Sequence, residues 1–251
     1  MYTKTLGLVL RETEYKDADK LLTVLTKDRG KLTFRARGVR SRSSRLKSGC
    51  QLLAYSEFTV FENKNTMVVD EAVAQELFLP LRQDIELLAL ASYFTQVAET
   101  LAREEESDEA LLSLTLNALA ALSRPDAVPQ KIKAAFEFRA ACIAGYGPIL
   151  DGCCVCGRED PDRFLVSGGC LACVGCRSDG ESGLRLPISA GSLAALRYLA
   201  DCPPKRVFSF QLGEASMKEL SDVAETYLLT QLERGFFTLD FYKSLKMTEI
   251  K

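Results

Sequence analysis

The sequence predicts an α+β multidomain protein: an N-terminal OB-fold β-barrel, then an all-α helical domain with an inserted four-cysteine zinc module. Three observations predict this arrangement. Short segments with strand patterning fill residues 1–78, apolar residues recur at helical spacing from Pro80 onwards, and two Cys-x-x-Cys pairs lie within 150–182. The remaining ranges, 79–149 and 183–251, are expected to be the first and second parts of the helical domain.

Five short strands are expected in the first region. They are Thr5–Arg11, Lys20–Thr26, Lys31–Arg37, Ala54–Glu62 and Thr66–Val73. These segments alternate apolar and polar residues or are rich in β-branched and aromatic side chains. Five strands of this length fit a small closed barrel of the OB type, with a small open sheet as the alternative.

A basic segment, Lys27–Lys47, dominates the charge pattern. It holds nine Lys or Arg residues and one acid, a local charge of +8, whereas the chain as a whole has 32 basic and 34 acidic residues. The rest of the chain therefore carries −10. A concentrated basic block on an acidic protein indicates a polyanionic partner. The alternative is a solvated loop whose charge only maintains solubility.

The pattern within the basic segment favours the polyanion. Leu32, Phe34 and Ala36 alternate with polar residues, so the arginines between them share the opposite face of a strand. Gly38 and the Ser-rich stretch after it predict a flexible basic loop beside that strand. This arrangement suits a grip on phosphates without base readout. The candidate nucleic-acid-binding residues are Lys31, Arg35, Arg37, Arg40, Arg42, Arg45 and Lys47.

Five main helices are expected after the barrel. They cover Leu81–Arg103, a helix capped by Ser107 and ending at Arg124, Pro129–Ala144, Ser189–Leu199 and Ser216–Arg234. The acidic run Glu104–Glu106 is expected to be a solvated helix end. The aromatic tail that follows Gly235 is expected to be core.

The helix expected at Pro129–Ala144 carries an arginine on its apolar side. Arg139 falls on the stripe formed by Ile132, Ala135 and Phe136. A cation beside an apolar groove could bind the carboxylate of a partner peptide, with Lys131 and Lys133 adding charge. The alternative is an arginine that snorkels or is paired internally.

The cysteines between 150 and 182 predict a metal site. Cys153 and Cys156 form one Cys-x-x-Cys pair, and Cys173 and Cys176 form a second. Four thiolates at this spacing suit tetrahedral Zn²⁺ in a closed, structural site, with an Fe–S cluster as the less favoured alternative. Cys170 and Cys154 lie close enough in sequence to replace one of these ligands, and the spacing does not choose between them.

Composition limits the classes of function. The chain has no histidine and no tryptophan, so histidine-based catalysis and histidine metal ligands are excluded. We also find no phosphate-cradling glycine loop and no nucleophile–base set, so we expect a protein that is not an enzyme. No apolar run reaches the roughly 18 residues of a membrane span, and the start lacks a signal-peptide pattern. We therefore expect a cytoplasmic, nucleoid-associated location.

The order of a basic barrel, a helical body and a four-cysteine insert resembles the bacterial recombination mediator family RecO. The most specific matches are GKLTFRARGVRSRSSRLK and FEFRAACIAGYGPILDGCCVCG, and the resemblance covers essentially the whole chain. SGGCLACVGC departs slightly, because the second cysteine pair usually follows the two glycines more closely. Some family members lack the cysteines.

The resemblance implies a DNA-repair factor without catalytic activity. Such proteins bind single- and double-stranded DNA, anneal complementary strands and act with RecR to load RecA onto DNA coated by single-stranded-DNA-binding protein (SSB). They also contact the C-terminal tail of SSB through the helical body. The competing hypothesis is a zinc-dependent protein-interaction adaptor with an incidental basic loop.

Overall fold

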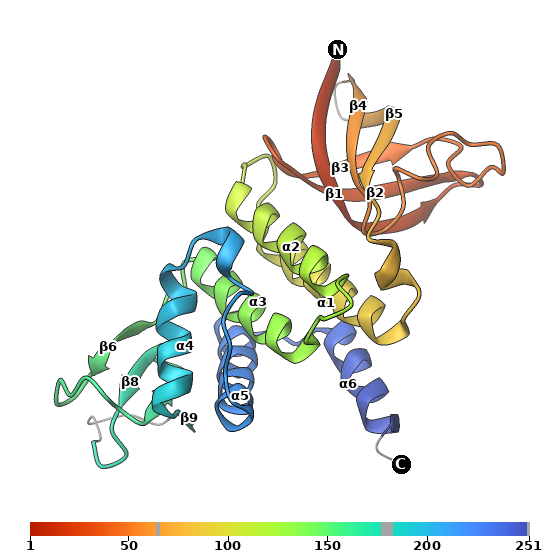
Figure 1. The fold of residues 1–251 in the computed structure, drawn as a ribbon. Helices are drawn as coiled ribbons and strands as arrows, with labels where there is room; N and C mark the ends of the chain where they lie inside the picture. The colour runs from red at the N-terminus through yellow and green to blue at the C-terminus, as the bar shows by residue number, and fades with distance from the viewer. Residues whose placement is uncertain (64–65, 177–182, 250–251) are drawn as a thin grey trace. The chain divides into compact units, whose positions relative to one another are not determined.

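A computed structural model describes residues 1–63, 66–176 and 183–249 (Figure 1). The chain divides into two compact units. The first, here called the barrel unit, contains Met1–Pro125 and Phe236–Lys251, and the second, the cysteine unit, contains Asp126–Gly235. The last residues of the expected zinc module, 177–182, and the chain's final residues, 250–251, lie outside the described residues.

The N-terminal strands close into a five-stranded barrel in the order β1-β2-β3-β5-β4. They are β1 (Tyr2–Tyr15), β2 (Asp19–Thr26), β3 (Gly30–Ala36), β4 (Tyr55–Asn63) and β5 (Thr66–Glu76). A short parallel pairing of β3 with β5, at Phe34–Met67 and Arg35–Val68, completes the ring, while the other pairings are antiparallel. The predicted OB-type barrel is confirmed, and the open sheet is excluded.

Alternating side chains fill the interior of this barrel. Leu32, Phe34 and Ala36 point inward from β3, as their spacing predicts. The rings of Phe34 and Phe58 meet edge to face at 5.4 Å between centroids in the middle of the core. The residues of β3 that alternate with them therefore face outward.

Helices of the barrel unit follow the strands. They are the 3₁₀ helix η1 (Leu79–Arg82), α1 (Ile85–Leu101), α2 (Glu109–Leu122) and the C-terminal α6 (Phe237–Glu249). The single helix expected from Leu81 to Arg103 is wrong in its limits. The side chain of Asp84 accepts the N–H groups of Glu86 and Leu87, at 2.8 and 3.0 Å, and so starts α1 after η1.

Two further expectations are corrected by the contacts of the barrel unit. Asp108, not Ser107, caps α2, because its carboxylate accepts the N–H of Leu111 at 2.9 Å. The aromatic tail becomes helix α6, which packs on α1, with Phe236 and Tyr242 buried. Its Phe237 is exposed, so only part of the tail is core. Among the described helices, none is long and apolar enough to cross a membrane.

In its described residues, the cysteine unit combines three α-helices and a short 3₁₀ helix with a small sheet. Helix α5 (Glu214–Gln231) packs on α3 (Pro129–Ile143) and α4 (Ala190–Asp201), with the short 3₁₀ helix η2 (Pro204–Arg206) after α4. The chain segment that connects α3 to α4 forms a four-stranded sheet of order β6-β8-β7-β9. Its strands are β6 (Ile149–Cys153), β7 (Arg163–Leu165), β8 (Cys170–Ala172) and β9 (Arg185–Pro187).

Candidate nucleic-acid interface and metal centre

Arg35 of the basic segment is engaged inside the barrel unit. Its Nε and Nη2 donate to Oδ2 of the buried Asp19 at 2.8 and 2.6 Å, and the N–H of Gly38 donates to Oδ1 at 2.8 Å. The Gly38 amide and then the Arg35 guanidinium lower the pKa of Asp19 below its usual value. Asp19 thus joins β2, β3 and the start of the basic loop.

Lys31 is also engaged within the barrel unit. Its Nζ donates to the carbonyl of Glu99, near the end of α1, at 3.1 Å. Its backbone N–H donates to the carbonyl of Arg103 at 3.0 Å, and its carbonyl accepts the N–H of Glu105 at 3.4 Å. Glu104 forms β-bridges with Gly30 and Lys31, so Glu104–Glu106 is not a helix end but a segment docked on β3. Sequence periodicity contains no signal for this long-range pairing.

A pocket of 650 Å³ lies along this docked segment. Polar and charged groups line it, including Arg11 and Lys31 together with the four carboxylates of Glu62, Glu99, Glu104 and Glu105. Arg11 is itself paired with Glu99 at 2.8 Å. Because the carboxylates outnumber the cations, the pocket is poorly suited to phosphate.

The accessible cations lie further along, in the loop that follows β3. Arg37, Arg42, Arg45 and Lys47 are exposed. Arg40 is also exposed, although it forms an ion pair of 3.2 Å with Glu14. These five residues, Arg37, Arg40, Arg42, Arg45 and Lys47, are here called the basic loop cluster.

The loop that carries this cluster is folded, which corrects the expectation of a flexible arm. Val39 is buried in the barrel core and Leu46 packs against it. The N–H of Arg40 donates to the carbonyl of Ala18 at 3.0 Å, and the N–H of Cys50 donates to that of Leu46 at 3.0 Å. The loop therefore presents its cations from a fixed base, because apolar residues placed between the arginines anchor it.

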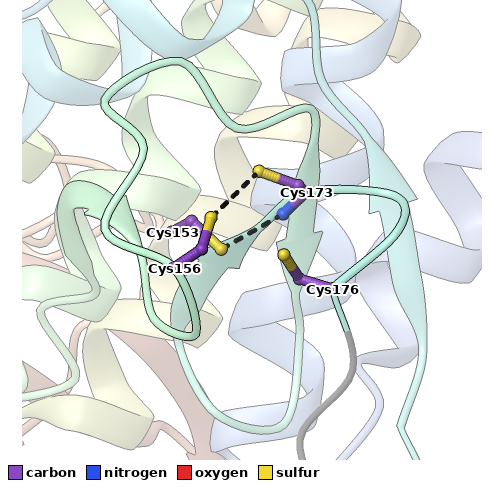
Figure 2. Close-up of side chains that lie close together, drawn as sticks. All are labelled: Cys153, Cys156, Cys173 and Cys176. Carbon is purple, nitrogen blue, oxygen red and sulfur yellow. Dashed lines mark hydrogen bonds between the residues drawn. The ribbon is translucent and has the colours of Figure 1, made fainter.

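The four predicted metal ligands come together in the cysteine unit. The sulfur atoms of Cys153, Cys156, Cys173 and Cys176 all lie within 4.8 Å of one another (Figure 2). Cys153 ends β6, and Cys173 directly follows β8, so the parallel pairing of these strands brings the two cysteine pairs side by side. Within the described residues, the metal-binding group contains neither Cys154 nor Cys170.

The electrostatics of the cluster suit a divalent cation. Burial acts to raise the pKa of Cys153, but the backbone amides of Cys156, Val155 and Cys173 outweigh it and lower that pKa to about 6. For Cys173, burial and the neighbouring sulfurs raise the pKa to about 12. The protein thus favours the thiolate form of Cys153 and disfavours deprotonation of Cys173. A bound cation would stabilise both thiolates. Four sulfur ligands fit a tetrahedral metal site.

The three predicted peptide-binding residues all contact groups of the cysteine unit. Arg139 donates to the carbonyl of Leu199 at 2.9 Å and to that of Ala200. It thereby supplies a hydrogen-bond donor to backbone carbonyls in the last turn of α4. Lys131 reaches the carbonyl of Phe210 at 3.5 Å.

The third of these residues, Lys133, is enclosed. It is buried between Glu137 and Glu225, with contacts of 2.8 and 2.7 Å. Burial acts to lower the pKa of Lys133, and the two carboxylates together raise it above its usual value.

Comparison with known proteins places both units in one family. Residues 1–77 match the model of the recombination protein O N terminal, and residues 82–240 match that of the recombination protein O C terminal. The DNA repair protein RecO of Acetivibrio thermocellus is 34% identical, with 97% of each chain covered. Those of Moorella thermoacetica (32%; 91% of this chain, 85% of the relative) and Symbiobacterium thermophilum (29%; 96% of each) are also similar. This chain therefore belongs to the RecO family, and its role lies in DNA repair and recombination.

Proposed function

We propose that this chain is a non-catalytic, DNA-binding recombination mediator of the RecF pathway. It binds single- and double-stranded DNA, anneals complementary strands and, together with RecR, helps to load RecA onto SSB-coated single strands. The observation that carries the DNA-binding part is the basic loop cluster on its anchored loop. Family membership supports the remaining steps.

The physical case rests on how the cations are presented. Arginine and lysine side chains on one folded loop can contact successive phosphates without reading bases, which suits a protein that must accept any sequence. Arg35 and Lys31, which contact Asp19 and Glu99 respectively, contribute by holding β3 and the loop in place. Direct phosphate contact is assigned to the exposed cluster.

For the metal we propose Zn²⁺ in a structural role. Four cysteine sulfurs fill a tetrahedral shell and leave no position for water or substrate. Bound zinc would hold the ends of β6 and β8 together in a sheet whose strands are too short to be stable alone.

For the SSB tail we propose that the cysteine unit supplies the binding cations. Arg139 and Lys131 are only partly buried, so each can add an anionic ligand to its present contacts. Lys133 supports the site indirectly, because Glu137 and Glu225 already neutralise its charge.

Fluorescence anisotropy of labelled single-stranded DNA across a salt series tests the proposal. Five engaged cations should give a slope of log affinity against log salt of roughly −3.5, at about −0.7 per phosphate contact. An SSB tail peptide, titrated separately, tests the second surface. Failure to bind DNA even at low salt would refute the mediator and leave the basic loop as a solvated surface, which is the adaptor hypothesis.

A further inference from the structure

Tyr15 stands out among the aromatic residues of the barrel because cations surround it. It ends β1 and pairs with Asp19 across the β1–β2 hairpin, and its side chain is exposed, with 36% of the residue accessible. The guanidinium of Arg35 lies over its ring at 5.2 Å from the centroid, and the Nζ of Lys16 lies over it at 5.4 Å.

The basic loop cluster reaches this hairpin directly. Arg40 donates from its backbone N–H to the carbonyl of Ala18 at 3.0 Å and from Nη1 to the carbonyl of Asp17 at 3.3 Å. It also pairs with Glu14 at 3.2 Å. The residues on both sides of Tyr15 in the sequence, Glu14 and Asp17–Ala18, therefore contact Arg40, a cation of the cluster.

We infer that Tyr15 is a stacking site for an unpaired nucleobase, placed beside the phosphate-binding cluster. This inference rests on the proposed DNA-binding function and adds a preference for single strands to it. An exposed tyrosine offers a flat apolar face, and bases stack on such rings regardless of sequence. Arg35 is fixed by Asp19 and so holds its place against the ring, whereas Lys16 is exposed on a flexible stem and can turn to a phosphate.

Stacking on Tyr15 requires a base whose face is uncovered. In a duplex each base is covered by its neighbours, so the ring contributes to binding of single strands and not of duplexes. Stacking also involves no exchange of counterions, in contrast to the contacts of the cluster. Loss of the ring should therefore lower affinity equally at every salt concentration.

A second exposed tyrosine on the same strand provides the matched control. Tyr2, at the other end of β1, is 61% exposed, and its ring packs against that of Phe61 at 5.1 Å. Lys4, two residues further along β1, forms an ion pair with Glu57 of β4, with 3.5 Å between its Nζ and the carboxylate. Tyr2 thus has the exposure of a stacking residue but lies at the opposite end of β1 from the hairpin that Arg40 contacts.

The test compares Tyr15→Ala, Tyr15→Leu, Tyr15→Phe and Tyr2→Ala in the full chain by anisotropy with single-stranded and duplex DNA. We expect Tyr15→Ala and Tyr15→Leu to weaken single-strand binding about tenfold with an unchanged salt slope, and to leave duplex binding within about twofold. Tyr15→Phe and Tyr2→Ala should match the wild type. An oligonucleotide containing 2-aminopurine should lose fluorescence on binding to the wild type and to Tyr15→Phe, but not to Tyr15→Ala.

Other outcomes separate the stacking site from the proposed function. Suppose that substitutions in the basic loop cluster weaken DNA binding but Tyr15→Ala does not weaken single-strand binding. The stacking site is then refuted, and the proposed mediator function is retained. Equal losses on single strands and duplexes would also refute stacking, because they would indicate a displaced loop. A wild type that binds no DNA would refute both.

Discussion

Arg35 Nη2 lies 2.6 Å from Asp19 Oδ2, and the other oxygen of the same carboxylate accepts the N–H of Gly38 at 2.8 Å. One buried acid thereby holds an arginine of β3 and Gly38, near the start of the basic loop. Removal of its charge should therefore affect both the stability of the barrel unit and the binding of DNA.

Asp19→Asn should lower the melting temperature and weaken DNA binding. The Gly38 amide and Arg35 keep the pKa of Asp19 below its unfolded value of about 3.9. Its contribution to stability is therefore fully present above that value and is lost as pH falls through the lower, folded pKa. Thermal unfolding should be measured for wild type and variant from about pH 7 down to about pH 3. The difference between their melting temperatures should shrink at the acid end. A difference that is constant with pH would contradict the ion pair.

The basic loop cluster should determine the salt dependence of binding. Replacement of Arg40, Arg42, Arg45 and Lys47 with Ala should flatten the log–log salt slope by about 3 and weaken single-strand binding by on the order of 10²–10³ at about 0.1 M salt. Arg35→Ala should instead lower the melting temperature, since Asp19 then loses its ion-pair partner and keeps the Gly38 N–H. Anisotropy and thermal unfolding of both variants measure this contrast. A quadruple variant with the wild-type slope would exclude the cluster as the phosphate contact.

Gly30 should be far less tolerant of a side chain than Gly38, although their φ angles are +62° and +61°. A Cβ at Gly30 would lie 2.0 Å from the carbonyl oxygen of Glu106, whereas nothing lies within 4 Å at Gly38. Gly38→Ala should cost about 1 kcal/mol for its left-handed backbone alone. Gly30→Ala should cost roughly 3 kcal/mol, because the docked acidic segment must also move. Urea unfolding measures both, and equal costs would show that the segment yields freely.

Metal removal should affect the cysteine unit and spare DNA binding. Chelation, or Cys176→Ser, should unfold the small sheet that carries the four cysteines, because their thiols then lack the shared cation. Native mass spectrometry should find one zinc ion per chain, and hydrogen exchange should locate the loss of protection in β6 to β9. If chelation abolished DNA binding while the fold persisted, the module would itself contact DNA.

Lys133 should be essential to the fold of the cysteine unit. Lys133→Met would remove the ammonium that lies 2.8 Å from the carboxylate of Glu137, a residue that is 0% exposed, and should cost about 3–5 kcal/mol in urea unfolding. The double variant Lys133→Met/Glu137→Leu should recover most of this loss, because both charges of the buried ion pair are then replaced by apolar side chains.

The same ion pair also predicts a response to alkaline pH. The pKa of Lys133 in the folded protein is raised above its unfolded value of about 10.4. Its stabilising contribution is therefore fully present below that value and is lost as pH rises through the folded pKa. The wild type should lose stability there relative to the double variant, and parallel pH profiles would contradict the assignment.

The sequence by itself determined the local and periodic features of this protein. Period-2 patterning located the strands, as at Leu32, Phe34 and Ala36, because one face of each strand had to be buried. Cysteine spacing indicated two Cys-x-x-Cys pairs, because such a turn brings two sulfurs together locally, but it left Cys154 and Cys170 as possible replacements until the fold brought Cys153, Cys156, Cys173 and Cys176 together. The net charge of Lys27–Lys47 could also be predicted from the sequence, since it depends on composition alone.

Only the tertiary structure decided which charges are accessible and which are used internally. Lys31, Arg35 and Lys133 look equivalent to their basic neighbours in sequence, yet each contacts a group distant along the chain. The docking of Glu104 on β3 and the position of Arg35 over the Tyr15 ring likewise depend on segments that meet only when the chain folds. Such pairings have no local signature, because a side chain's partner is set by the path of the folded backbone.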